Sequence, residues 1–176
     1  MTTYQTTIDL RSHGGSPSFL DITDQVREAV KASGISTGIC TVISPHTTCG
    51  IYFDEFSHDQ LDSGTDFLQA DLDAALSRMF PAQQDFPPAH GYQYPGEEHF
   101  QAVESWPNAA TYLPGGDRSQ LLNADAHLKA NIIGSSETVA VIDGAVAFGS
   151  TGYVFFVDFD RARSRERRCH IVVTGD

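Results

Sequence analysis

A short loop groups several side chains that can bind ligands or move protons. The segment Pro45-His-Thr-Thr-Cys-Gly50 contains an imidazole, two hydroxyl groups and a thiol, and Glu55 follows on the next expected strand. Imidazole and carboxylate groups are ordinary ligands of zinc and manganese, and a neutral histidine needs a neighbour that fixes its tautomer. His46 is therefore a candidate metal ligand or catalytic group. Thr47 and Thr48 are candidate ligand-binding hydroxyls, and Glu55 is a candidate general base.

The thiol of the same loop allows a different chemistry. Cys49 and His46 could form a nucleophile and base, because thiolate formation requires a nearby proton acceptor or cation. A buried and inert cysteine is the commoner state of this residue type. The residues alone leave both alternatives open.

A second candidate group is the pair Asp125-Ala-His127 at the start of an expected helix. Such a pair can reach one side of the chain and hold a divalent ion, although helix capping and a solvated histidine are simpler explanations. His99 and His90 lie in a long loop and could complete the metal shell or fold over a substrate. The alternative for these two is a solvated acidic loop. Zinc, manganese and magnesium are the candidate ions.

Two segments could bind phosphate. Gly134-Ser-Ser136 follows an expected helix, so its backbone N–H groups and the hydroxyls of Ser135 and Ser136 could cradle a phosphate group. No Walker lysine or Rossmann glycine spacing accompanies it, and a plain turn is the alternative. The run Arg161-Ala-Arg-Ser-Arg-Glu-Arg-Arg168 is either a solvated hairpin turn or a local anion-binding edge.

Bulk composition limits the possible classes of protein. The chain has 176 residues, 40% of them hydrophobic and 19% charged, which excludes global disorder and fits one domain over residues 1–176. A net charge of −12 repels polyanions and argues against a nucleic-acid partner. Three cysteines without a CxxC pair favour a reducing compartment. No segment has the length of apolar residues needed to cross a membrane and no signal peptide is recognisable, so we expect a cytoplasmic protein.

The hydrophobic pattern predicts an α+β fold of about seven strands, mostly antiparallel, and about three helices. Strands are expected at 4–10, 19–22, 38–43, 51–53, 137–142, 145–148, 153–159 and 170–173. Helices are expected after Thr23, over 59–79 and from Asn123 to about Ile133. Residues 81–120 hold six prolines and read as an extended irregular insertion, which in a compact domain is usually functional or covers a partner.

Several of these motifs, in this order and spacing, resemble the YjbQ family. The matching segments are Pro45-His-Thr-Thr-Cys-Gly-Ile51, Asn123-Ala-Asp-Ala-His-Leu-Lys129, Gly134-Ser-Ser136, Gly144, Gly149 and the tail from Asp158-Phe-Asp160 to Val173. The resemblance covers the chain from about residue 4 to the C-terminus, apart from much of 81–120. It implies a compact β-sandwich that assembles as a homotrimer, with weak thiamin phosphate synthase activity.

The resemblance also implies roles for individual residues. The family pairs a histidine in an HT[ST] loop with a histidine in an A-H-[IL]-[KR] helix, and these positions are His46 and His127. The implied reaction joins a pyrimidine methyl pyrophosphate to a thiazole phosphate, with a divalent ion that neutralises the leaving pyrophosphate. His46, Asp125 and His127 would hold the ion, and Lys129 or Arg163 would bind the second phosphate. Non-catalytic binding of metal or a phosphorylated ligand, and metal-assisted hydrolysis with Glu55 as base, are the alternatives.

Departures from the family pattern concern the expected site. Members often read N-A-H-x-H where this chain has Asn123-Ala-Asp-Ala-His127, so a carboxylate replaces a histidine at Asp125. The family's G-T-W-Q turn is Gly149-Ser-Thr-Gly152 here, without tryptophan or glutamine. An oxygen ligand at Asp125 would shift metal preference toward harder ions. A different ligand is expected if the turn residues shape the pocket.

Overall fold

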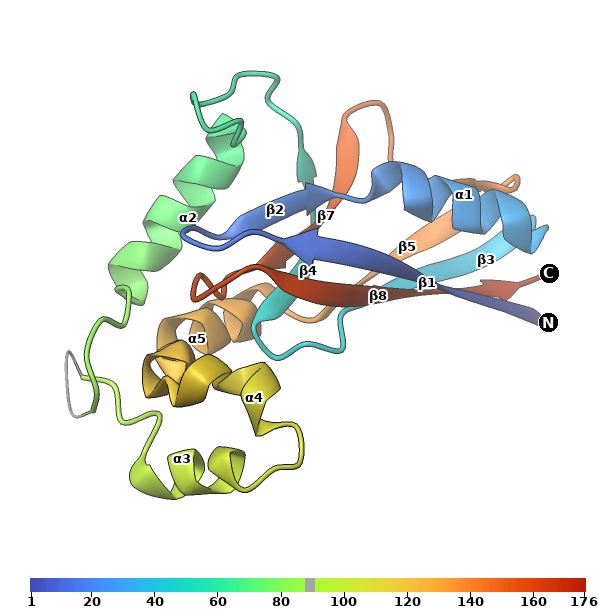
Figure 1. The fold of residues 1–176 in the computed structure, drawn as a ribbon. Helices are drawn as coiled ribbons and strands as arrows, with labels where there is room; N and C mark the ends of the chain where they lie inside the picture. Colours follow the sequence, from blue (N-terminus) through green and yellow to red (C-terminus); the bar gives the residue numbers. More distant parts are fainter. Residues whose placement is uncertain (88–90) are drawn as a thin grey trace.

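Two antiparallel sheets form the centre of the molecule. The computed structural model describes residues 1–87 and 91–176, and Figure 1 shows the arrangement of its elements. The larger sheet has the order β1-β8-β3-β5-β6, and the smaller has the order β2-β7-β4. The larger sheet contains β1 (Thr2–Ser12), β3 (Thr37–Ile43), β5 (Ser136–Ile142), β6 (Ala145–Val146) and β8 (Arg165–Gly175). The smaller contains β2 (Ser18–Asp21), β4 (Cys49–Glu55) and β7 (Gly152–Asp158).

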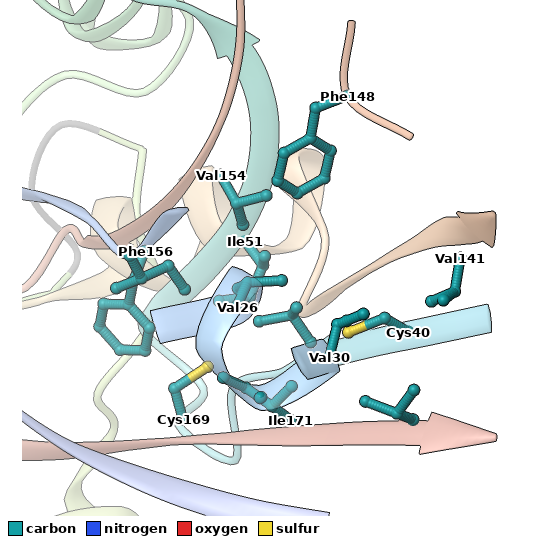
Figure 2. Packing of buried hydrophobic residues seen from close by; sticks show 14 of the residues in the cluster. Val26, Val30, Cys40, Ile51, Val141, Phe148, Val154, Phe156, Cys169 and Ile171 are labelled. Carbon is teal, nitrogen blue, oxygen red and sulfur yellow. The ribbon is translucent and has the colours of Figure 1, made fainter. Parts of the chain in front are cut away.

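The two sheets share one apolar core with the first helix, α1 (Thr23–Ser33). Val26 and Val30 of α1 lie among Ile51, Cys40 and Ile171, which come from three different strands (Figure 2). The alternating burial along β3 and β8 supplies one face of this core, as expected for strands with one covered face. The predicted α+β fold with mostly antiparallel strands is confirmed.

A second apolar cluster lies on the other face of the smaller sheet. Phe155, Val157 and Phe159 pack there against α2 (Phe67–Met79) and α5 (Ala124–Ile133). Both faces of β7 are therefore covered, which explains why its sequence is a continuous apolar run instead of an alternating one. The arrangement fixes α5, whose first turn carries His127, against the end of the strands that leads into the arginine-rich segment.

The described residues between 81 and 121, which are 81–87 and 91–121, are more regular than the sequence suggested. They contain α3 (Glu97–Glu104), α4 (Ala109–Tyr112) and the 3₁₀ turns η1 (Pro114–Gly116) and η2 (Arg118–Leu121). Their apolar residues form a small cluster of their own, made of Phe100, Val103, Leu113 and Leu121 with Tyr112 against it. Prolines and glycines separate these short helices. Residues 91–121 are therefore largely helical where an irregular insertion was expected, and we call this segment the helical flap.

Element boundaries differ from the expected ones for local reasons. The helix expected from residue 59 begins at Phe67, because Gly64 has φ +83° and the side chain of Asp66 accepts from the backbone N–H of Leu68 at 2.9 Å. The hairpin turn at Asp143-Gly144 is confirmed, with positive φ at both residues. In the described part of the chain there are eight strands and five α-helices, and none of these helices could span a membrane.

Candidate functional site: a cavity lined by histidine and arginine

A cavity of about 610 Å³ opens between the helical flap and one end of the strands. Its wall combines the loop after β3, the first turn of α5, the start of β8 and side chains of the flap. The polar lining includes His46, Thr47, Thr48, His99, Asn123, His127, Asp160, Arg163, Arg165 and Arg167, and the aromatic lining is Tyr94, Trp106 and Tyr112. The two histidines predicted from the sequence therefore meet at one cavity.

His46 is fixed by a hydrogen bond to the backbone. Its ring atom Nε2 accepts from the backbone N–H of Arg168 at 2.9 Å, and the backbone N–H of His46 donates to the Ser44 hydroxyl at 3.2 Å. Burial lowers the pKa of His46, and the neighbouring Arg167 guanidinium lowers it further. The ring is therefore held neutral near pH 7 and in one orientation.

His127 stands on the first turn of α5 against aromatic side chains. The Tyr94 ring meets it edge-on with centroids 5.4 Å apart, and the Tyr94 hydroxyl lies 3.1 Å from His99 Nε2. Burial lowers the pKa of His127, while Asp160 and the Thr47 carbonyl oppose that shift. A neutral imidazole at the cavity wall can accept a proton at neutral pH.

A buried ion pair supports the floor of the cavity. Arg167 Nε donates to Asp158 Oδ2 at 2.7 Å, and Arg167 Nη2 donates to Asp158 Oδ1 and to the Thr48 hydroxyl, both at 3.2 Å. The Thr48 hydroxyl in turn donates to Asp158 Oδ1 at 3.3 Å. The Arg167 guanidinium holds the pKa of Asp158 below its usual range, against the opposing effect of burial. This network ties β8 to β7 and to the loop between β3 and β4, residues 44–48, which we call the histidine loop because it contains His46.

A second buried carboxylate organises the neighbouring wall. Asp160 Oδ2 accepts from Asn123 Nδ2 at 2.9 Å and lies 2.7 Å from Arg165 Nη2. The direction of the Arg165 N–H groups does not match this contact, so Nε and Nη2 of Arg165 make no hydrogen bond within the described residues, and neither does Asn123 Oδ1. Arg165 is therefore charge-paired with Asp160, and its Nε and Nη2 atoms are enclosed within the wall.

Arg163 joins the flap to the rest of the molecule. Its guanidinium donates to the backbone oxygens of Thr111 and Tyr112 and to the Gln120 side chain at 3.2 Å. All three acceptors are neutral, so its positive charge adds to the field of Arg165 in the same wall. Arg163 was predicted to bind substrate phosphate, and it does line the cavity, but its hydrogen bonds hold the flap.

Loss of the Arg163 side chain is expected to loosen the flap. In Arg163→Ala, amide hydrogen exchange over residues 109–121 should become faster by about tenfold, because the hydrogen bonds that dock this segment are removed. Exchange in β1 and β3 should not change. Arg27→Ala, which removes an exposed arginine on α1, serves as the control. Equal protection of 109–121 in the wild type and Arg163→Ala would contradict this role.

The four residues expected to share a metal ion do not assemble as a donor set. Asp125 lies on the other side of the helix start, where Oδ2 accepts from Arg161 at 3.0 Å and Oδ1 accepts from the Gln83 N–H at 3.3 Å. His46 uses Nε2 for Arg168, and His99 contacts Tyr94. No group of three His, Cys, Asp or Glu side chains is placed to hold a metal anywhere in 1–87 or 91–176. His90 falls outside the described residues.

Four other expected site residues lie away from the cavity. Lys129 is buried between α5 and α2, where Nζ donates to Asp73 at 2.9 Å and to Ser77 at 2.8 Å. Ser135 and Ser136 are exposed at the start of β5, and Glu55 is exposed at the far end of β4. The structure therefore does not bring these four residues to the cavity, and their predicted roles in phosphate binding and general-base catalysis form no part of the site described above.

The nucleophilic alternative for Cys49 is not supported. The side chain is buried, with 1% of its surface exposed, and burial is the main reason why its pKa is raised. A protonated, enclosed thiol is a poor nucleophile. Cys49 belongs to the apolar core shared by the two sheets.

The sequence motifs assigned no individual role to Arg165, Arg167 or Asp160, which all line the cavity. Their signal is visible in β8, where Arg165 and Arg167 alternate with exposed residues in phase with the core residues Cys169 and Ile171. Period-two alternation continues from the apolar half of the strand into its charged half. Both arginines therefore face inward, which favours an anion-binding edge over a solvated turn.

The chain is a small α+β sandwich protein with a cavity lined by histidine and arginine side chains. A family model described as UPF0047 protein YjbQ-like matches residues 6–176, and the chain belongs to this family. A UPF0047 protein of Methanocaldococcus jannaschii is 27% identical over 157 residues, covering 89% of this chain and 85% of the relative. YugU of Bacillus subtilis is 26% identical over 156 residues, or 89% of each chain.

Solved structures of the family agree with the fold. A YjbQ/UPF0047 protein of Clostridium acetobutylicum superposes with a TM-score of 0.64 and 26% identity, covering 95% of this chain and 99% of that one. A YbjQ-like protein of unknown function from Sulfolobus solfataricus gives the same TM-score at 24% identity, covering 99% of this chain and 100% of that one. The family model shows the family, and the solved structures show the fold; neither shows an activity.

Proposed function

We propose that the cavity binds a small phosphorylated molecule and that the protein transfers an organic group from a pyrophosphate ester. The observation that carries this is the concentration of Arg163, Arg165 and Arg167 with His46 and His127 on one cavity wall. The whole chain has a net charge of −12, so three arginines on one wall are a local concentration. Arg165 and Arg167 are paired with Asp160 and Asp158, whereas Arg163 has only neutral acceptors. Guanidinium groups and neutral imidazoles together suit phosphate oxygens.

The reaction that we propose is of the thiamin phosphate synthase type. The methylene C–O bond of a pyrimidine methyl pyrophosphate would break and release pyrophosphate, assisted by a base of the wall that takes a proton from an N–H group of the pyrimidine. The methylene carbon would then form a bond to the ring nitrogen of a thiazole phosphate, and the proton would return to the pyrimidine. Negative charge develops on the leaving pyrophosphate oxygen, and arginine side chains at the wall stabilise it. Because the expected metal ligands do not converge, no step of this proposal depends on a divalent ion.

Pyrophosphate binding tests the proposed site directly. Isothermal titration of the wild type with inorganic pyrophosphate should show one saturable site per chain. Arg165→Gln should weaken it by about ten- to hundredfold, since a charge-assisted hydrogen bond contributes about 1.5–3 kcal/mol. Arg27→Gln removes the same charge from exposed α1 and should leave affinity unchanged. Equal affinities in the two variants, with both folded by near-UV circular dichroism, would refute the site.

Turnover separates an enzyme from a binding protein. Wild-type protein is incubated with the pyrimidine pyrophosphate and the thiazole phosphate, with and without Mg²⁺, and thiamin phosphate is measured by chromatography. Saturable turnover that Arg165→Gln loses supports the transferase. Pyrophosphate binding without turnover would instead favour the non-catalytic role, in which the cavity only holds a phosphorylated ligand.

A further inference from the structure

The histidine loop completes a hydrogen-bond ladder that the backbone leaves open. β3 pairs with β8 as far as Ile43 opposite His170, and beyond this point the chain turns away at Ser44-Pro45. On that side of β8 the backbone N–H of Arg168 therefore has no strand partner. The His46 ring supplies the acceptor, with Nε2 at 2.9 Å from the Arg168 nitrogen. Backbone N–H groups in folded proteins nearly always have such an acceptor.

This bond decides which nitrogen of His46 carries the proton. A backbone N–H can only donate, so Nε2 must present its lone pair to Arg168. A neutral imidazole then holds its single proton on Nδ1. A doubly protonated ring would lose the bond to Arg168 and would place a second cation beside Arg167. Both the ladder and the local charge therefore favour the neutral ring protonated on Nδ1.

The free nitrogen belongs to a residue of the cavity wall. No partner for Nδ1 is found among residues 1–87 and 91–176, and His46 lines the cavity together with Arg165 and Arg167. A group that can only donate, placed beside two guanidinium groups, is matched by an oxygen acceptor. We propose that His46 is a neutral hydrogen-bond donor that presents Nδ1–H to an oxygen of the bound anion, with Nε2 locked by the backbone of Arg168.

This assignment deepens the proposed function, on which it rests for the chemistry of the ligand. It gives His46 a role different from that of a proton acceptor or of a metal ligand through Nε2. Proton uptake during a reaction then falls to other groups of the wall. His46 would touch the phosphorylated ligand and stabilise charge on it without changing its own protonation.

The tautomer can be read in the free protein by long-range proton–nitrogen NMR of the imidazole rings at pH 7, with the His46 signals assigned from their loss in His46→Asn. We expect a pyridine-type Nε2 and a pyrrole-type Nδ1. On addition of inorganic pyrophosphate, Nδ1 should shift while Nε2 stays pyridine-type. A pyrrole-type Nε2, or two protonated nitrogens at pH 7, would overturn the proposal. The proposal would also be overturned if pyrophosphate binds in the calorimetric titration but the NMR signal of His46 Nδ1 does not shift.

A matched pair of variants tests the donor itself. His46→Asn keeps an N–H near the position of Nδ1, whereas His46→Leu has a similar size and no donor. Pyrophosphate affinity should fall by about tenfold or more in His46→Leu and clearly less in His46→Asn. Equal losses in two folded variants would overturn the donor role. If the wild type itself does not bind pyrophosphate, the proposed function fails, and the NMR measurement on the free protein shows separately whether the locked tautomer exists.

Discussion

Replacing Arg167 with methionine is expected to lower the free energy of unfolding by about 3–5 kcal/mol, the usual cost of leaving a buried charge without its partner. Asp158 is fully buried and takes two hydrogen bonds from Arg167. After the substitution the donors that remain to Asp158 carry no charge; they include the Thr48 hydroxyl and the backbone N–H of Asp160. Methionine fills most of the space, so the loss reports the charge more than the packing.

Urea unfolding of single and double variants measures this pair. Arg167→Met and Asp158→Asn should each be destabilised, and the double variant should lose less than the sum of the two, because no unpaired charge remains in it. Arg11→Met, at an exposed ion pair between β1 and Glu166, is the control and should change stability by less than about 1 kcal/mol. Strict additivity, or a loss in Arg167→Met as small as in the control, would show that the pair is not coupled.

The pair also illustrates what could be read from the sequence. Arg167 lies in a run of five arginines that suggested a solvated turn or an anion-binding edge. The decisive feature is the phase of alternation with Cys169 and Ile171, which places Arg165 and Arg167 on the core face of β8 and Arg168 on the opposite face. The number of charged residues in the run does not reveal which of them face the core. The carboxylate that makes burial possible, Asp158, is contributed by another strand and is invisible to any local pattern.

The helix containing Asp125 and Lys129 shows the opposite case. Residues at the start of a helix were expected to reach one side, yet Asp125 and His127 face different hollows because the helix turns between them. Lys129 is buried because Asp73 of α2 pairs with it. Which face of α5 lines the cavity depends on how α2 and the helical flap pack around it. That packing cannot be predicted from the residues of α5 alone.

The sequence motifs predicted the position of a side chain well where neighbouring residues along the chain determine that position. The loop at His46 is bounded by a proline and leads into β4, so its position at the end of two strands followed from the sequence. The convergence of His46 and His127 on one cavity was implied by family resemblance and agrees with the structure. The contribution of Tyr94 and Trp106 from the flap could not be derived, because the flap packs around its own apolar cluster.

His127→Gln is expected to lower the turnover number of the proposed transferase by about 10²–10⁴-fold, the usual contribution of a positioned proton-transferring group. His127 lines the cavity beside Tyr94, and burial is the main cause of its lowered pKa. Its neutral form is therefore available to take a proton, while His46 is held as a donor by Arg168. Glutamine retains a polar group of similar reach, so pyrophosphate affinity should change far less than turnover.

The pH dependence gives the sign of this role. Because the pKa of His127 in the free protein lies below the ordinary histidine value of about 6.5, the acidic limb of kcat/KM should have its midpoint below that value. Values of kcat/KM between pH 5 and 8 would show this limb in the wild type, and it should be absent from the residual activity of His127→Gln. An unchanged acidic limb in His127→Gln would assign the proton transfer to another group of the wall, for which His99 beside Tyr94 is the nearest alternative.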